Sequence, residues 1–290
     1  MTDATAPELS IIVPTYARPA RLVRCVRALL ASEGVRAEIV VVDDGSPEPA
    51  EAALRSEELL ADTVAVHRQE NAGPAAARNA GARLAKSGVL LFTDDDCEPE
   101  PDWALAMSQR LAADPEALVG GRTVNALETN PYSAASQDLV SYLYEGGAPL
   151  GYFTSNNLAC SKATFDEVGG FDESFPLAAG EDREIGLRWG ASGRALAYEP
   201  KAVVRHHHEM TLRSFWRQHA NYGRGARHLR RIGGAGAPAG HRFSGPAFYA
   251  GLVTYPMKAR RPQALSRSAL LLLSQAATSW GFVTPPRPRG

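Results

Sequence analysis

The chain is poor in cysteine. Its three cysteines, Cys25, Cys97 and Cys160, lie far apart among 290 residues and form no Cys-x-x-Cys pair. An odd and widely spaced set excludes a disulfide framework and argues against a structural zinc site. It favours a reducing, cytoplasmic compartment.

Acidic residues are almost missing from the last third of the chain. Residues 1–200 hold 16 Lys and Arg against 31 Asp and Glu, a net charge of −15. Residues 201–290 hold 15 Lys and Arg and a single acid, Glu209, a net charge of +14. The formal net charge of −1 hides this division. It indicates that the two parts meet different partners, and the basic part suits nucleic acid, anionic lipid, a phosphorylated ligand or the acidic part itself.

Long hydrophobic runs are also missing. The longest apolar stretch near the end, residues 269–282, is interrupted by serine, glutamine and threonine, so it is too short and too polar to span a membrane. The first nine residues are polar and acidic, and we expect no signal peptide there. With 44% hydrophobic and 22% charged residues, the composition predicts a folded, soluble protein.

Strand-like and helix-like segments alternate over the first hundred residues. The expected strands are 10–15, 37–42, 63–67 and 88–93, and the expected helices are 19–32, 48–60 and 74–85. Such alternation predicts an α/β fold with a mostly parallel central sheet flanked by helices. In open α/β sheets the ligand lies beyond the carboxyl ends of the strands. Here Thr15, Asp43-Asp44 and the triplet Asp94-Asp95-Asp96 stand at three such ends.

The second half is less regular. Its expected helices are 101–113, 132–144, 181–192 and 211–231, and its expected strands are 118–124, 155–161, 195–198 and 202–205. A Gly/Ala/Pro linker at 233–240 precedes an amphipathic stretch at 265–282, and we expect the Pro/Arg-rich tail from residue 284 to be disordered. We therefore expect a nucleotide-binding and catalytic domain over residues 1–210 and a basic, mainly helical C-terminal extension over residues 211–290.

Two acidic clusters at strand ends suggest a nucleotide site. The adjacent carboxylates Asp94, Asp95 and Asp96 repel one another unless a cation neutralises them, and oxygen ligands favour Mg²⁺ or Mn²⁺. Such an ion commonly bridges carboxylates to substrate phosphates, which implies a nucleoside diphosphate. Asp43-Asp44-Gly45-Ser46 suits a ribose or base contact, or equally an ordinary turn with a helix cap.

Three further groups are candidates for chemistry. Glu181-Asp182 opens an expected helix, where the pair either complements the helix dipole or supplies a general base. In the run 206–208, alternation along a strand would place His206 and His208 on one side, where one of them could complete a metal site. Arg78, one turn into an expected helix, could meet an anionic or carbonyl group of a nucleotide.

Together these features resemble a known family, the family 2 glycosyltransferases, which are inverting, nucleotide-sugar-dependent enzymes with the GT-A fold. The matching stretches lie between residues 9 and 225 in the family's order. They are Ser-Ile-Ile-Val-Pro-Thr-Tyr (10–16), Val-Val-Asp-Asp-Gly-Ser (41–46), Asn-Ala-Gly-Pro-Ala-Ala-Ala-Arg-Asn (71–79), Phe-Thr-Asp-Asp-Asp (92–96), Gly-Gly-Phe-Asp (169–172), Gly-Glu-Asp (180–182) and the three histidines (206–208). Any one stretch is weak evidence, whereas seven in order form a specific match.

The resemblance implies a nucleotide-binding role for several residues. Pro14 and Tyr16 would lie beside the base, and Asp44 would contact the base or the ribose. Arg78 would also contact the nucleotide. The triplet 94–96 matches the family's DxD element, so Asp95 would face the nucleotide too.

The same resemblance implies a metal site. Asp96 is the first candidate ligand of a Mn²⁺ or Mg²⁺ ion, while Asp94 would reach the ribose or a metal-bound water. His206 would be the late metal ligand, with His208 as the alternative.

It also implies the catalytic base. Asp182 matches that base, with Glu181 beside it. Processive members of the family carry a Gln-x-x-Arg-Trp element and many transmembrane helices. Here Ile185 stands where that glutamine would precede Arg188-Trp189, so we expect transfer of a single sugar.

The expected function is a metal-dependent inverting glycosyltransferase that uses a nucleoside-diphosphate sugar and an unidentified acceptor hydroxyl. A nucleotidyltransferase is one alternative, although no Gly-rich loop follows the first expected strand. A non-catalytic sugar-nucleotide-binding protein is the other. The basic end lacks a nucleic-acid-binding motif, so we expect no nucleic-acid partner. Peripheral contact with the inner membrane face and a homo-oligomer contact remain open for the C-terminal part.

Overall fold

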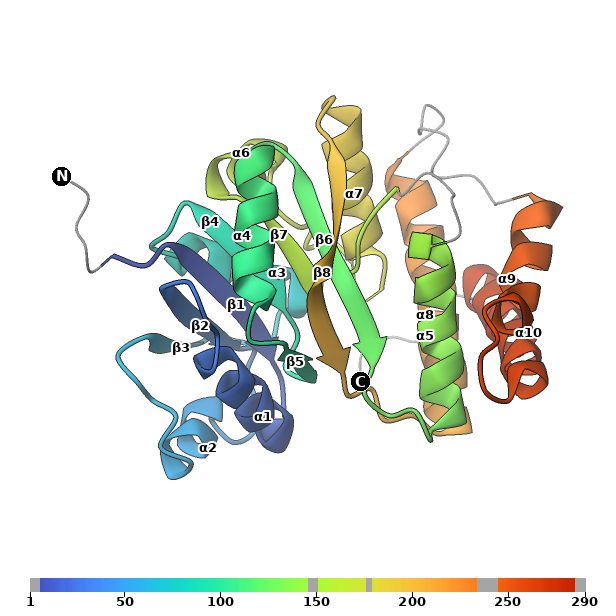
Figure 1. The fold of residues 1–290 in the computed structure, drawn as a ribbon, viewed down its shortest axis with the longest axis horizontal. Coiled ribbons are helices and arrows are strands. Elements are labelled where there is room, and N and C mark those ends of the chain that lie inside the picture. Colours follow the sequence, from blue (N-terminus) through green and yellow to red (C-terminus); the bar gives the residue numbers. More distant parts are fainter. Residues whose placement is uncertain (1–5, 146–150, 176–178, 234–244, 285–290) are drawn as a thin grey trace. The chain divides into compact units, whose positions relative to one another are not determined.

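The computed structural model describes residues 6–145, 151–175, 179–233 and 245–284 (Figure 1). Contacts divide the chain into two compact units. Residues 1–124 and 151–206 form the first, here called the sheet unit, and residues 125–150 and 207–290 form the second, here called the helical unit. The stretch 125–150 thus groups with the C-terminal residues. The expected functional boundary at residue 210 stays a prediction.

An eight-stranded sheet is the centre of the fold (Figure 1). Its strands are β1 (Leu9–Thr15), β2 (Ala37–Asp43), β3 (Val64–Arg68), β4 (Val89–Thr93), β5 (Cys97–Pro99), β6 (Leu118–Asn125), β7 (Asn157–Ser161) and β8 (Leu196–His206). They follow the order β3-β2-β1-β4-β7-β6-β8-β5. The first four in this order are parallel, whereas β7 is antiparallel to β4 and β6, and β5 is antiparallel to β8. The predicted α/β fold is confirmed, with a sheet that is parallel in its N-terminal half and mixed as a whole.

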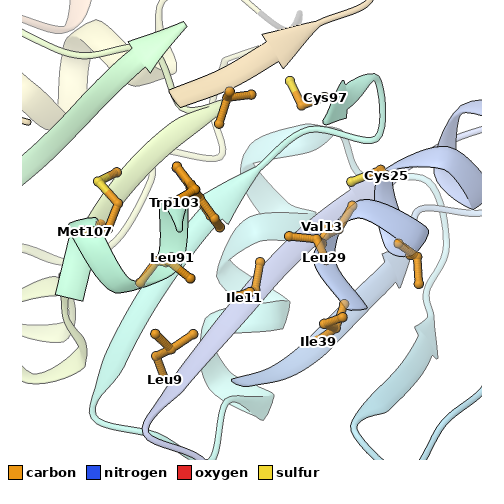
Figure 2. Packing of buried hydrophobic residues seen from close by; sticks show 14 of the residues in the cluster. Leu9, Ile11, Val13, Cys25, Leu29, Ile39, Leu91, Cys97, Trp103 and Met107 are labelled. Carbon is orange, nitrogen blue, oxygen red and sulfur yellow. The ribbon is translucent and has the colours of Figure 1, made fainter. Parts of the chain in front are cut away.

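Helices cover both faces of this sheet. They are α1 (Pro19–Leu30), α2 (Ala50–Ser56), α3 (Pro74–Leu84), α4 (Trp103–Ala113), α6 (Lys162–Val168) and α7 (Glu181–Ala191). On one face Ile11 of β1 belongs to the same buried cluster as Leu29 of α1 and Trp103 of α4 (Figure 2). Because successive strand residues point to opposite faces, Ile12 lies on the other face, against α3. A Cβ atom at Gly81 of α3 would lie 2.4 Å from Ile12 Cγ2, so glycine permits this close approach.

The structure corrects the predicted elements in several places. The two strands expected at 195–198 and 202–205 are parts of one strand, β8, which begins at Leu196 and continues through Pro200, because the φ angle that proline imposes is compatible with an extended chain. The strand β5 and the helix α6 were not predicted, since each is too short to show a periodic pattern. Residues 234–240 of the expected linker and 285–290 of the expected tail lie outside the described residues.

The helical unit contains α5 (Pro131–Glu145), α8 (Leu212–Ile232), α9 (Pro246–Lys258) and α10 (Ala264–Val283), of which α9 was not predicted. Helices α8 and α10 approach closely at two glycines. A Cβ atom at Gly223 would lie 1.9 Å from the Thr278 carbonyl oxygen, and one at Gly281 would lie 1.8 Å from that of Ala220. Within the described residues, no helix has the length and apolar character needed to cross a membrane.

Candidate functional site

The parallel strands end in polar residues at one edge of the sheet. Thr15 at the end of β1 and Asp43 at the end of β2 are partners in the parallel register. The acidic triplet follows the end of β4 at Thr93. Thr15 Oγ1 donates a hydrogen bond to Asp95 Oδ2 at 2.8 Å, which joins residues 80 positions apart. The strand ends therefore meet, as expected for a parallel sheet.

Two arginines near the start of α1 neutralise the buried part of the triplet. Asp95 and Asp96 are 3% and 6% exposed. Arg18 Nη1 lies 3.0 Å from Asp95 Oδ1, and Arg21 Nη1 lies 3.2 Å from Asp96 Oδ2. Burial nevertheless raises the pKa of Asp95 to about 6. The sequence reasoning missed both arginines, although their position directly after β1 placed them at the same sheet edge.

Asp96 also meets a histidine from the other end of the chain. Its Oδ1 lies 3.3 Å from His206 Nε2, because β5 and β8 pair with Cys97 opposite His206. Donor atoms of Asp96, Cys97 and His206 all lie within 4.8 Å of one another. Burial raises the pKa of the Cys97 thiol well above its usual value, and a protonated thiol is a poor ligand for hard cations. The carboxylate therefore fits Mn²⁺ or Mg²⁺, the imidazole fits the transition metal Mn²⁺ better than Mg²⁺, and the protonated thiol fits neither ion.

The two candidate histidines are not equivalent. Strand β8 ends at His206, so the expected alternation through His208 is wrong. His208 belongs to the helical unit, where its carbonyl oxygen accepts a hydrogen bond from the Ser133 hydroxyl. His206 is the histidine found beside Asp96, and a metal role for either residue stays a prediction.

Arg78 joins the acidic triplet to the acidic pair. Its side chain is 4% exposed. Nη2 lies 2.7 Å from Asp94 Oδ1, and Nη1 lies 3.2 Å from Glu181 Oε1. Burial by itself would lower the pKa of Arg78. The negative charges of Asp94 and Glu181 outweigh this effect, so the pKa of Arg78 is above its usual value. Arg78 Nε and Glu181 Oε2 are two of several buried side-chain atoms of the described residues that have no hydrogen-bond partner within the protein.

The acidic pair divides into a buried and a more accessible member. Glu181 is 4% exposed, and burial raises its pKa. Asp182 is partly exposed, and its Oδ1 accepts a hydrogen bond from the Arg183 amide at 2.7 Å. Burial, together with the negative charge of Glu181, raises the pKa of Asp182 to about 7. A carboxylate of this pKa can accept a proton near neutral pH.

The two carboxylates at the end of β2, Asp43 and Asp44, accept hydrogen bonds from other residues of the chain. Asp43 accepts hydrogen bonds from the amides of Ser46 and Ala50, at 2.8 and 2.9 Å, and so caps α2. Asp44 accepts from Gln69 Nε2 and from the amides of Ala72 and Gly73, at 2.8 to 2.9 Å. Asp44 thereby holds the loop that leads into α3. Its contact with a base or ribose stays a prediction.

Pro14 and Tyr16 lie on either side of Thr15. Pro14 is buried in β1 opposite Val42. Tyr16 is 48% exposed directly after the strand. An exposed ring at a strand end can stack on a base, as the resemblance implies, and this role also stays a prediction.

The Gly-Gly-Phe stretch packs against α3. Asn79 Oδ1 accepts a hydrogen bond from the Phe171 amide at 2.9 Å, and Asn79 Nδ2 donates to the Phe171 carbonyl oxygen at 2.8 Å. Gly170 has a φ of +66°, and a Cβ atom there would lie 2.8 Å from Asn79 Oδ1. The matched stretches 71–79 and 169–172 therefore contact each other directly.

The comparisons with known sequences agree on one family. A sequence profile described as "Glycosyl transferase family 2" matches residues 10–171, more than half of the chain. Pre-mycofactocin glycosyltransferase of Mycobacterium tuberculosis is 31% identical over 227 residues, which cover 74% of this chain and 46% of that protein. Validoxylamine A glucosyltransferase of Streptomyces hygroscopicus subsp. jinggangensis is 30% identical over 229 residues, which cover 67% of this chain and 54% of that protein. The chain spans about half the length of the curated relatives it matches.

Two solved structures share the fold. A mannosyltransferase from Pyrobaculum calidifontis, in complex with GDP-Man and Mn²⁺, matches with a TM-score of 0.61 and 20% identity, covering 93% of this chain and 75% of that one. GalNAc-T7, with UDP, GalNAc and Mn²⁺, matches with a TM-score of 0.57 and 18% identity, covering 77% of this chain and 48% of that one. The predicted GT-A fold is confirmed.

Proposed function

Because the chain belongs to glycosyl transferase family 2, we propose that it is a metal-dependent, inverting glycosyltransferase that moves one sugar from a nucleoside-diphosphate sugar to an acceptor hydroxyl. One observation carries this proposal. The carboxylate–histidine pair Asp96–His206 and the acidic pair Glu181–Asp182 lie in the same compact unit and are connected through Asp94 and Arg78. The nucleotides and Mn²⁺ in the two structural neighbours support such a donor.

Asp96 and His206 are the residues that would hold the cation, with Asp94 next to them. When bound, a divalent cation supplies positive charge that stabilises a departing diphosphate. Tyr16, exposed at the end of β1, would stack on the base. The expected contact of Arg78 with the nucleotide stays a prediction, and Arg78 would also keep Asp94 oriented toward the donor, because its Nη2 lies 2.7 Å from Asp94 Oδ1.

Asp182 is the proposed general base. The acceptor hydroxyl oxygen forms a bond to the anomeric carbon as its proton moves to the Asp182 carboxylate. The bond from the anomeric carbon to the diphosphate breaks, and the diphosphate leaves with the electron pair. A single in-line displacement inverts the anomeric centre, so no covalent enzyme intermediate is required. Burial, together with the negative charge of Glu181, raises the pKa of Asp182 to about 7, so that its carboxylate can accept a proton near neutral pH.

The compartment and the number of sugars transferred are inferred from the cysteines and from Ile185. All three cysteines are free and buried, which suits a reducing, cytoplasmic compartment. Ile185 in place of the glutamine of processive enzymes supports transfer of a single sugar. The acceptor would be a glycan, a lipid-linked sugar or a small molecule with a free hydroxyl.

Replacement of the proposed base tests this function. Nucleoside-diphosphate release is measured for a panel of nucleotide sugars with Mn²⁺ or Mg²⁺, and the most active donor is kept. Asp182→Asn is expected to lower transfer by about a thousandfold or more while leaving nucleotide binding in calorimetry nearly unchanged. Glu33→Gln, at an exposed acid of the same unit, is the control and should transfer normally. Normal turnover by Asp182→Asn would refute the base. No release from any donor would instead favour the binding-protein alternative.

A further inference from the structure

Helix α10 exposes large apolar side chains to solvent, where polar side chains would be expected. The exposed apolar residues recur every three or four positions and form one stripe, here called the α10 outer face; the exposed serines Ser266 and Ser279 lie beside it in the sequence. It consists of Leu265, Ala269, Leu272, Ala276, Trp280 and Val283. The four large members are 77%, 57%, 55% and 68% exposed, respectively. In a helix that packs on a hydrophobic core, such residues normally face the core. Their exposure here indicates that this face binds a partner.

The buried side of α10 explains why the large residues point outward. Apart from Leu271, the buried residues are small: Ser268, Ser274, Ala277 and Gly281. They allow α8 to approach so closely that a Cβ atom at Gly281 would collide with the Ala220 carbonyl oxygen. The packing between the two helices therefore uses small residues, and the leucines and tryptophan of the outer face take no part in it.

The C-terminal residues that carry this face are strongly basic. Residues 210–290 contain 13 Lys and Arg and no Asp or Glu. Lys258, the last residue of α9, and Arg260, in the turn between α9 and α10, are both exposed. At the other end of the helix, Arg227 Nη1 donates to the Val283 carbonyl oxygen at 3.3 Å. Basic groups thus flank the outer face at both ends.

We propose that the α10 outer face docks on an anionic lipid surface. Its apolar side chains would enter the boundary between headgroups and acyl chains, and the flanking basic residues would contact lipid phosphates. This surface is a property of the helical unit and does not depend on the transfer reaction.

Charge distinguishes this partner from two others. A second copy of the chain would bring another strongly basic unit against the first, which like charges oppose. Nucleic acid requires basic side chains at the contact itself. The only charged residue of α10 is Arg267, whose guanidinium lies 3.2 Å from the buried carboxylate of Asp138. An apolar centre with basic ends fits a lipid surface better than either alternative.

Vesicle flotation of the full chain tests the proposal. We expect the protein to float with vesicles that contain about 30 mol% phosphatidylglycerol, to float much less with pure phosphatidylcholine, and to be released by salt. The double variant Leu272→Gln/Trp280→Gln should lower the partition coefficient by about tenfold or more, because two apolar side chains that would enter the lipid are lost. Lys258→Gln/Arg260→Gln should lower it by about tenfold at low salt only. Leu84→Gln, at a leucine 45% exposed on α3, is the matched control and should bind like the unaltered protein.

Three results would overturn the proposal. The first is that the unaltered protein does not float with anionic vesicles. The second is that the Leu272→Gln/Trp280→Gln variant floats to the same extent as the unaltered protein. The third is that light scattering shows a dimer for the unaltered protein and a monomer for this variant, which would identify a second copy of the chain as the partner of the α10 outer face. Circular dichroism and thermal melting confirm that the variants are folded, and normal transfer activity in them would separate this surface from the catalytic site.

Discussion

Asp182 should reduce the stability of the folded protein at neutral and alkaline pH. Its pKa rises from 3.8 to about 7 on folding, because burial and the charge of Glu181 disfavour the ionised form. When an acid has a higher pKa in the folded state than in the unfolded state, its contribution to stability is fully present at pH values below the unfolded-state pKa. This contribution is lost as the pH rises through the folded-state pKa. The window of loss therefore runs from about pH 4 to about pH 7.

The magnitude follows from the size of the shift. About three pKa units correspond to about 4 kcal/mol at 1.36 kcal/mol per unit. Asp182 is partly exposed, so solvent screening reduces this figure to about 2 kcal/mol. Asparagine has nearly the same shape, and its side-chain oxygen can still accept the hydrogen bond from the Arg183 amide. Asp182→Asn should therefore raise the free energy of unfolding by about 2 kcal/mol at about pH 8 and change it little at about pH 4.

Urea denaturation at both pH values measures this difference. Of the four tryptophans, Trp103 and Trp189 are fully buried in the sheet unit, whereas Trp216 and Trp280 are already exposed, so the change in fluorescence on unfolding reports mainly on the unit that contains Asp182. Glu33→Gln, the exposed carboxylate control, should show no pH-dependent gain. An equal effect of Asp182→Asn at both pH values, or destabilisation at about pH 8, would refute the raised pKa and with it the proposed protonation behaviour of the base.

Two further substitutions test the charges around the site. Arg78→Gln should destabilise the protein by about 3 to 5 kcal/mol in urea denaturation, because it leaves the buried Glu181 carboxylate without its cation; a loss below about 1 kcal/mol would contradict the bridge to Asp94 and Glu181. Arg21→Gln should tighten Mn²⁺ binding by about two- to fivefold in calorimetry, since Arg21 competes with the ion for Asp96 across a partly exposed pair. Unchanged or weaker binding would show that Arg21 does not compete.

The local pattern of the sequence was enough to place most of the parallel half of the sheet. Strand β1 and helix α1 follow from a short apolar run and from apolar residues at helical spacing, with proline at the helix start. Carboxyl ends of neighbouring parallel strands must lie at one edge, so Thr15 and the acidic triplet were expected to meet. Hydrogen bonding between Thr15 and Asp95 is the direct consequence.

Other features depend on contacts between distant residues, which no local pattern encodes. Cys97 and His206 meet because a three-residue strand pairs with the end of β8, and that strand is too short to predict. The sequence placed Arg78 in a helix and Glu181 in another, but only the tertiary structure decided that they form an ion pair across 103 positions. The exposure of the leucines on α10 was likewise decided by α8, whose glycine-based packing selects the small side of the helix. Periodicity determines which residues share a face, whereas burial of that face depends on which neighbour packs against it.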